Sequence, residues 1–428
     1  MLSTIKKFLL LSIFILITIS CGDDSTSNPV EDTTITPTYE VEYNEQTIIL
    51  NDDNNDLIIN LDSATNTYTF DGSRFSEDPE IGEVILVEGK LLRKVKSVSK
   101  SGGNLVIETE DAALTDAIQN GEIAWEVTPE WNNATSLKFD GVTVMTMPTE
   151  FNEKIEHTIS YGGIDHKIEI EPKLVDGKVN SCEFTFVMAK KIAGDATAAF
   201  TAKGTVKLPS QSTLIKIKEG KLDKFQSFNK GITADLDLSL SAAGSKSGNH
   251  SLELPGIALS IPIRFIPTPS GPIPLPIPVS IDIGIQFVTQ MTIPDVASSA
   301  TASSKLSLTA DGDFEYTGAS IKTEGKFGKD QITDGEFDAA ANIGLPIDVQ
   351  FGVAFPRVGL NIAGQELAYI HTGFTTGSSL KWGPLCKSGY VKMVVEGGYE
   401  LKVLGQTLAK KKEVFAERKR EAKGEGCQ

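Results

Sequence analysis

The chain has 428 residues and a formal net charge of -17. A chain of this length can bury a large core and has room for two or three domains. Its acidity argues against non-specific binding to phosphate backbones or anionic lipid, so we expect no nucleic-acid partner. Four histidines and four cysteines leave little material for metal or nucleophile chemistry.

The first residues predict an export signal. Lys6 and Lys7 are followed by an apolar run over residues 8–17, which is too short to span a bilayer. Thr18-Ile19-Ser20-Cys21 then resembles a bacterial lipobox, in which the cysteine becomes acylated after cleavage, although Thr18 stands where leucine is usual. Residues 1–20 are therefore expected to be a lipoprotein signal peptide. The alternative is an ordinary secretory signal that happens to contain a cysteine.

The residues after Cys21 refine the predicted location. Gly22-Asp23-Asp24 is similar to the acidic export signal of Bacteroidota lipoproteins, so the resemblance implies an outer-membrane protein that faces the cell exterior, with Asp23 and Asp24 as the signal. Acyl chains on Cys21 would hold it to the membrane. Residues 21–40 have almost nothing to bury and predict a disordered tether. Three sites resemble a Bacteroidota O-glycosylation motif: Asp24-Ser25-Thr26, Asp32-Thr33-Thr34 and Asp62-Ser63-Ala64.

Residues 41–147 predict a small β-rich module with one helix. Three β-prone runs, at 83–87, 94–98 and 105–108, are separated by glycine-containing turns and should form a small sheet. Residues 111–121 predict a short helix, with Thr109 or Asp111 as its N-cap and Gly121 as its stop.

Residues 148–428 predict a large all-β domain. Apolar residues occupy every second position over 257–265, 273–287 and 343–355, which is a strand pattern. The second run is far longer than an ordinary strand, so we expect an elongated antiparallel β-sandwich or an open, tube-like domain with long strands. Prolines at 272, 274, 276 and 278 remove the N–H donors from one side of this strand, so full pairing should begin only after Pro278.

The later cysteines predict one disulfide. In an oxidising compartment, Cys386 and Cys427 are placed to tie the C-terminal end to a strand, while Cys182 is expected to be a buried thiol. Two alternatives stay open, that all three are reduced and that Cys182 takes part in the bridge.

Candidate chemistry is sparse. His157 and His166 lie near acidic residues and could bind a metal, but a polar surface hairpin explains them better. Residues 52–56 begin like a calcium loop, yet Leu57 replaces the glycine that the loop needs, which favours a turn between two strands. Asp235, Asp237, Asp311 and Asp313 are read as polar faces of strands and turns. Trp125, Trp131 and Trp382 could stack on a glycan if they were exposed.

No catalytic motif is present in the sequence. We therefore expect a non-catalytic binding, adhesion or structural module on the cell surface, with no cofactor and no bound metal. One alternative is a β-protein that carries a hydrophobic ligand such as a lipid in a groove between its long strands. A further alternative is a protein that binds or hydrolyses glycans, since the sequence does not show whether two carboxylates lie at the required separation.

Overall fold

A computed structural model describes residues 35–423, except for positions 53, 63, 140–141, 149, 162–163, 192–196, 245–247, 294–297, 318–320, 327–331, 343–347, 364, 382–385 and 404–405. In several long strands of the C-terminal half it describes the backbone alone. Cys21, Asp23, Asp24, Trp382 and Cys427 lie outside the described residues.

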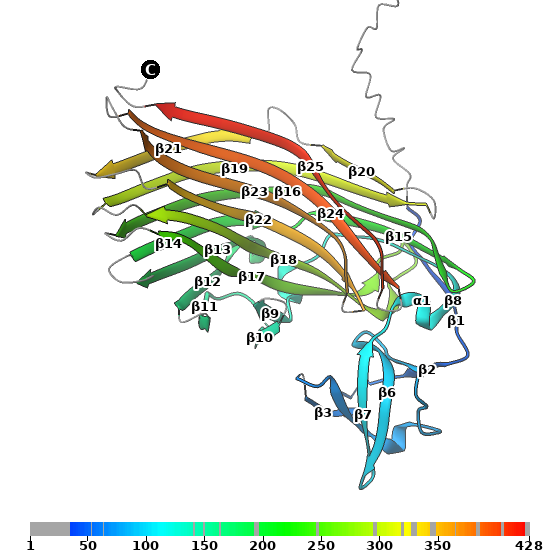
Figure 1. Ribbon diagram of the computed structural model, residues 1–428. Helices are drawn as coiled ribbons and strands as arrows, with labels where there is room; N and C mark the ends of the chain where they lie inside the picture. The colour runs from blue at the N-terminus through cyan, green and yellow to red at the C-terminus, as the bar shows by residue number, and fades with distance from the viewer. Residues whose placement is uncertain are drawn as a thin grey trace, which may run out of the picture. The chain divides into compact units, whose positions relative to one another are not determined.

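The described chain is mainly β, as the sequence predicts, and is arranged in three sheets (Figure 1). The largest is a curled antiparallel sheet of eleven strands. Eight of them follow the order β1-β8-β15-β16-β14-β13-β12-β11, and β19 branches from β16 and pairs with β20 and β21. Its strands are β1 (Thr38–Tyr43), β8 (Ile118–Val127), β11 (Ile155–Tyr161), β12 (Ile164–Val175), β13 (Lys178–Lys191), β14 (Thr197–Lys207), β15 (Ser210–Lys218), β16 (Lys221–Gly244), β19 (Ser298–Tyr316), β20 (Ile321–Lys326) and β21 (Ile332–Asn342).

The second sheet has eight antiparallel strands in the order β10-β9-β17-β18-β22-β23-β24-β25. These strands are β9 (Ser136–Phe139), β10 (Val142–Thr146), β17 (Gly248–Ile266), β18 (Ile273–Ile293), β22 (Asp348–Ile362), β23 (Gln365–Lys381), β24 (Cys386–Val403) and β25 (Gln406–Lys423). Figure 1 shows the long strands curving together along the sheet.

The third sheet has six strands in the order β2-β5-β6-β7-β4-β3, and it is mixed because β2 pairs with β5 in parallel. Its strands are β2 (Thr47–Leu50), β3 (Ile58–Asp62), β4 (Thr67–Asp71), β5 (Val84–Val87), β6 (Leu91–Ser101) and β7 (Asn104–Asp111). The predicted small sheet is thus confirmed for β5, β6 and β7. The strands on either side of this segment in sequence, β1 and β8, pair in the eleven-stranded sheet.

The predicted helix over 111–121 is wrong in its length. Only α1 (Leu114–Ala117) is helical, and Asp116 accepts the Ala113 N–H there at 2.9 Å. Gly121 is no helix stop but lies inside β8, where a Cβ would come within 2.9 Å of the Glu40 carbonyl oxygen. Pairing with β1 on one side and β15 on the other satisfies the β8 backbone, and this overrides the local helix preference.

The main core lies between the two larger sheets. From Ile257 to Ile263 in β17 and from Leu275 to Ile283 in β18 the odd-numbered residues are buried apolar side chains, and Leu259, Ile277 and Ile283 are fully buried. They belong to one cluster with Phe184, Phe186 and Phe200 of the eleven-stranded sheet, so these alternating faces meet in a filled interior. The six-stranded sheet has a second, smaller core around Phe70, Ile85 and Ile107.

The proline-rich start of β18 behaves as predicted. The ladder between β18 and β22 begins at Val279, directly after Pro278. The carbonyls still act as acceptors, because the Gly89 N–H donates to the Pro276 oxygen at 2.6 Å and the Ala363 N–H to the Pro278 oxygen at 2.8 Å. The proline carbonyls can therefore accept hydrogen bonds from loop N–H groups, but the missing proline N–H groups prevent a regular ladder with a neighbouring strand.

A row of bulges bends the eight-stranded sheet. The register shifts between Leu254 and Ile257 in β17 and between Gly284 and Gln286 in β18, which lie opposite one another. Gly284 permits this close approach, since a Cβ there would lie 1.9 Å from the Ile257 carbonyl oxygen. Aligned bulges increase local twist and let long strands curve.

Candidate functional site

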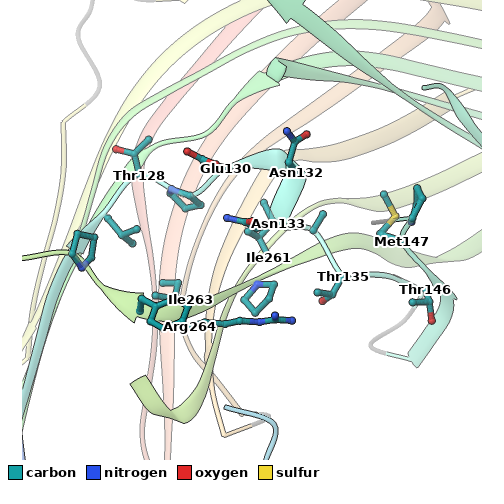
Figure 2. A pocket seen from close by; sticks show the side chains of 17 residues that line it. Thr128, Glu130, Asn132, Asn133, Thr135, Thr146, Met147, Ile261, Ile263 and Arg264 are labelled. Atoms are coloured by element: carbon teal, nitrogen blue, oxygen red, sulfur yellow. The ribbon is translucent and has the colours of Figure 1, made fainter. Parts of the chain in front are cut away.

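One hollow in the described residues forms where β17 loses a neighbour. β17 pairs with β18 as far as Ile266, but it pairs with β9 only from Ile257 to Ser260. The strand edge beyond Ser260 is therefore open on the β9 side. The segment that leaves β8 and passes through the 3-10 turn η2 (Trp131–Asn133) lies across this gap, and together they enclose a pocket of about 700 Å³ (Figure 2).

Buried anchors hold both walls of the pocket. Trp131 of η2 is 1% exposed and packs against Phe184 in the main core, with ring centroids 6.0 Å apart. Opposite it, the Thr135 N–H donates to the Ser260 oxygen at 2.9 Å and forms the last link between the two walls. Beyond that link stands Pro262, which has no N–H to offer a further strand. The pocket is thus a built feature of the fold.

A charged cluster fastens the base of the open edge. Lys138 of β9 and Asp282 of β18 form an ion pair at 2.9 Å across β17, and the Ser260 hydroxyl donates to the same carboxylate at 2.7 Å. Asp282 is 8% exposed. Because both oxygens of the Asp282 carboxylate have partners, this cluster holds β9, β17 and β18 together. Other side chains line the pocket.

The pocket is lined by polar side chains without partners. Among the described residues, Glu130, Asn132, Asn133 and Arg264 form no side-chain hydrogen bond or ion pair with one another or with any neighbour, and all four are exposed. In Figure 2, Glu130 and Asn132 lie on one wall, and the Arg264 side chain extends along β17 on the other. Such groups are available to a ligand without first breaking internal bonds.

Apolar residues complete the lining. Ile261, Ile263 and Met147 are buried beneath the polar groups, and Phe265 is 54% exposed at the end of β17. Glu130 is the one acidic side chain among the described lining residues. The described lining thus combines apolar side chains with one carboxylate and one guanidinium group.

The Asp52 loop is a turn, as predicted, and an ammonium group occupies its centre. The Lys90 Nζ donates to the Asp52 carboxylate, to the Asp52 carbonyl oxygen and to Asn55 at 2.6–2.7 Å, and the Leu57 N–H donates to Asp52 at 2.8 Å. Burial alone would raise the pKa of Asp52, but these hydrogen bonds outweigh it and lower the pKa. The lysine thus takes the place that a cation would need. The flanking strands β2 and β3 lie at opposite edges of their sheet.

The His157 and His166 segment forms the predicted hairpin of β11 and β12, but it does not gather a metal site. His166 is fully buried beside Phe139 and Phe186, so the expectation that it is a surface residue is wrong. The pairing of Ile159 with His166 turns the histidine inward, whereas its neighbour Asp165 is exposed. Among the described residues no group of three or more possible ligands is placed to hold a metal ion.

The outer face of this hairpin carries a ladder of ion pairs. Lys154 and Lys167 each contact both Glu156 and Glu169, at 2.6–3.3 Å. Hydrogen bonds from the two lysines lower the pKa of both glutamates. These mutually neutralised charges form a solvated strand face on which only Glu169 is partly buried, and they offer no unpaired charge to a ligand.

Neither tryptophan in the described residues is a stacking platform. Trp125 and Trp131 are buried. The Trp125 indole N–H donates to Gln211 at 2.6 Å, and Gln211 continues this interior network to Thr213 and Ser227. Burial of the indoles follows from their inward positions on β8 and η2.

Two of the carboxylates that the sequence places on strand faces and turns accept hydrogen bonds. Exposed Asp235 accepts from the Ser307 hydroxyl, and Asp311 accepts from the Gly231 N–H at 2.7 Å.

Cys182 is a buried, free thiol, as predicted, and burial raises its pKa. Cys386 is the first residue of β24, and its bond to Cys427 stays a prediction because Cys427 lies outside the described residues.

Sequence reasoning did not find the pocket. Two signals point to it in retrospect, since Pro262 and Arg264 interrupt the outward face of an otherwise regular strand. The decisive fact, that β9 stops pairing at Ser260, depends on tertiary structure.

Comparisons with protein-family models, with curated proteins and with solved structures found no match to this chain. Among the described helices, none combines the length and apolar character needed to cross a membrane.

Proposed function

We propose that this chain is a surface-anchored, non-catalytic binding module, and that the pocket between η2 and β17 is its binding site. The lipobox-like segment at Cys21 and the acidic residues Asp23 and Asp24 support attachment to the outer membrane with the folded body facing the exterior. Binding of a ligand at such a site gives the protein an adhesive or capturing role at the cell surface.

The observation that carries the proposal is the set of unpartnered polar side chains in a pocket whose walls are anchored by buried Trp131 and by the Thr135–Ser260 hydrogen bond. Pockets that bind small ligands combine an apolar lining with a few convergent polar groups, and their volumes are roughly 300–1,000 Å³. The pocket here has buried Ile261 and Ile263, four unpaired polar side chains and about 700 Å³ of space. Its single carboxylate favours binding over hydrolysis.

The hydrophobic-carrier alternative has less support. A lipid groove between the long strands needs exposed apolar residues on their inner faces. In the described parts of β17 and β18, Ile261, Ile277 and Ile281 are at most 1% exposed and pack in one cluster that spans both large sheets. Where these described residues pack, the interior leaves no room for an acyl chain.

A pocket-filling variant tests the proposal. The purified protein is titrated with three panels, oligosaccharides, extended peptides and fatty acids, and the binding ligand is then offered to Asn133→Trp. We expect one water-soluble class to bind the wild type and to lose binding in Asn133→Trp, because the indole occupies the pocket. The matched control Asn54→Trp, at another exposed asparagine, should bind normally. Binding that survives Asn133→Trp, or none from any panel, would contradict the proposal.

A further inference from the structure

The pocket presents two opposite charges that do not meet. Glu130 and Arg264 both line it, and neither has an ion-pair partner among the described residues. In Figure 2 they stand on opposite walls, with Asn133 between them. A ligand that fills this space must therefore satisfy a strong acceptor on one side and a strong donor on the other.

We propose that the ligand is a neutral saccharide, an inference that rests on the proposed binding function. A hydroxyl group both donates and accepts, so neighbouring sugar hydroxyls can donate to Glu130 and accept from Arg264 at once. The side-chain amides of Asn132 and Asn133 add further donors and acceptors between the two charges. Hydrogen bonds that involve a charged group are roughly twice as strong as neutral ones, which gives these two residues the leading part.

The apolar part of the site fits the same ligand class. Phe265 is more than half exposed beside the polar groups, and Pro262 and Pro267 also line the pocket. A sugar ring has apolar C–H faces and a polar rim, so it can lie on an aromatic ring while its hydroxyls reach polar side chains. Phe265 offers such an aromatic face to a ligand at this strand end.

Other ligand classes meet an obstacle here. A carboxylate would pair with Arg264 but would lie in the same pocket as the Glu130 charge, and a cation would meet the reverse problem. An acyl chain would bury four polar side chains without hydrogen bonds. A peptide strand added to the open edge of β17 would face Pro262, which has no N–H to donate.

The test uses the purified full-length protein and calorimetric titration with neutral oligosaccharides of glucose, galactose, mannose and N-acetylglucosamine. Oligosaccharides that contain uronic acid and an extended peptide library serve as rivals. We expect one neutral saccharide to bind, and we expect Arg264→Gln and Phe265→Ala to raise its Kd by about tenfold or more. Both residues are exposed, so both variants should keep their thermal stability, and Lys221→Gln, an exposed lysine outside the pocket, should bind as the wild type does.

The outcomes separate this inference from the proposed function. Preference for the uronate that rises in Glu130→Gln and disappears in Arg264→Gln would overturn the neutral class. Peptide binding that Asn133→Trp abolishes would overturn the saccharide and would leave the pocket's binding role standing. A neutral saccharide whose Kd is unchanged in both Arg264→Gln and Phe265→Ala would also overturn the assignment.

Discussion

Ile281→Asp should unfold the core between the two large sheets. Ile281 is 1% exposed and lies in the centre of β18, opposite Ile261 of β17 and Leu360 of β22, which are also buried. Removing such a side chain costs about 2–5 kcal/mol through lost burial and the cavity left behind. An unpaired carboxylate in apolar surroundings adds several kcal/mol, whether it stays charged or binds a proton. The sum is comparable to the whole stability of a typical domain, about 5–15 kcal/mol.

The assay is a urea titration followed by tryptophan fluorescence, because Trp125 and Trp131 are buried and report on the core. Ile281→Val should cost only about 0.5–1.5 kcal/mol. Ile81→Asp is the matched control: Ile81 is 75% exposed, so the same change should alter stability by less than about 0.5 kcal/mol. A stable Ile281→Asp protein that loses uptake of a fluorescent fatty acid would refute the packed core and favour a lipid groove.

Three further predictions concern other parts of the chain. Non-reducing peptide mapping should find Cys386 bonded to Cys427. This bond closes a loop and should stabilise the folded protein by a few kcal/mol in the chain-entropy picture. A disulfide from either cysteine to Cys182 would refute the pairing. The lysine partners of Glu169 lower its pKa. The ionised carboxylate therefore stabilises the fold above the ordinary glutamate pKa of about 4.3, and this stabilisation is lost as pH falls through the lower pKa of the folded state. Between about pH 5 and pH 3, Glu169→Gln should lose less stability than the wild type, and parallel curves of stability against pH for the two proteins would contradict this role. Gln211→Leu leaves the buried Trp125 N–H without its acceptor and should cost about 1–3 kcal/mol in urea titration, whereas an unchanged midpoint would show that the network contributes nothing.

Alternation of apolar and polar residues was enough to predict the long strands and their buried faces. Alternate burial at Leu259, Ile277 and Ile281 follows directly from a period of two, and the prolines fixed where β18 gains its second neighbour. Neither pattern says which strands pair. The sequence around Gly121 therefore suggested a helix end, and only its two strand neighbours, β1 and β15, explain why the segment is extended.

The pocket could not be predicted either, because it depends on which strands pair. Its walls come from η2 and β17, which are more than 100 residues apart in the chain, and they meet because β9 ends its pairing at Ser260. His166 shows a similar limit: a polar residue among charged neighbours suggested a surface, yet its register opposite Ile159 turns it into the core. Local composition does not determine register.

The most direct test of the central claim is to locate the protein and its anchor on living cells. Intact cells are treated with a protease that does not enter them, and the mature N-terminal peptide of the untreated protein is analysed by mass spectrometry. We predict that the mature protein begins at Cys21 and that this residue carries acyl chains. We also predict that the protease digests the folded body on intact cells. The double variant Asp23→Ala with Asp24→Ala should reduce this digestion. An unmodified Cys21 in a protein that the protease does not reach would contradict a surface-anchored binding module.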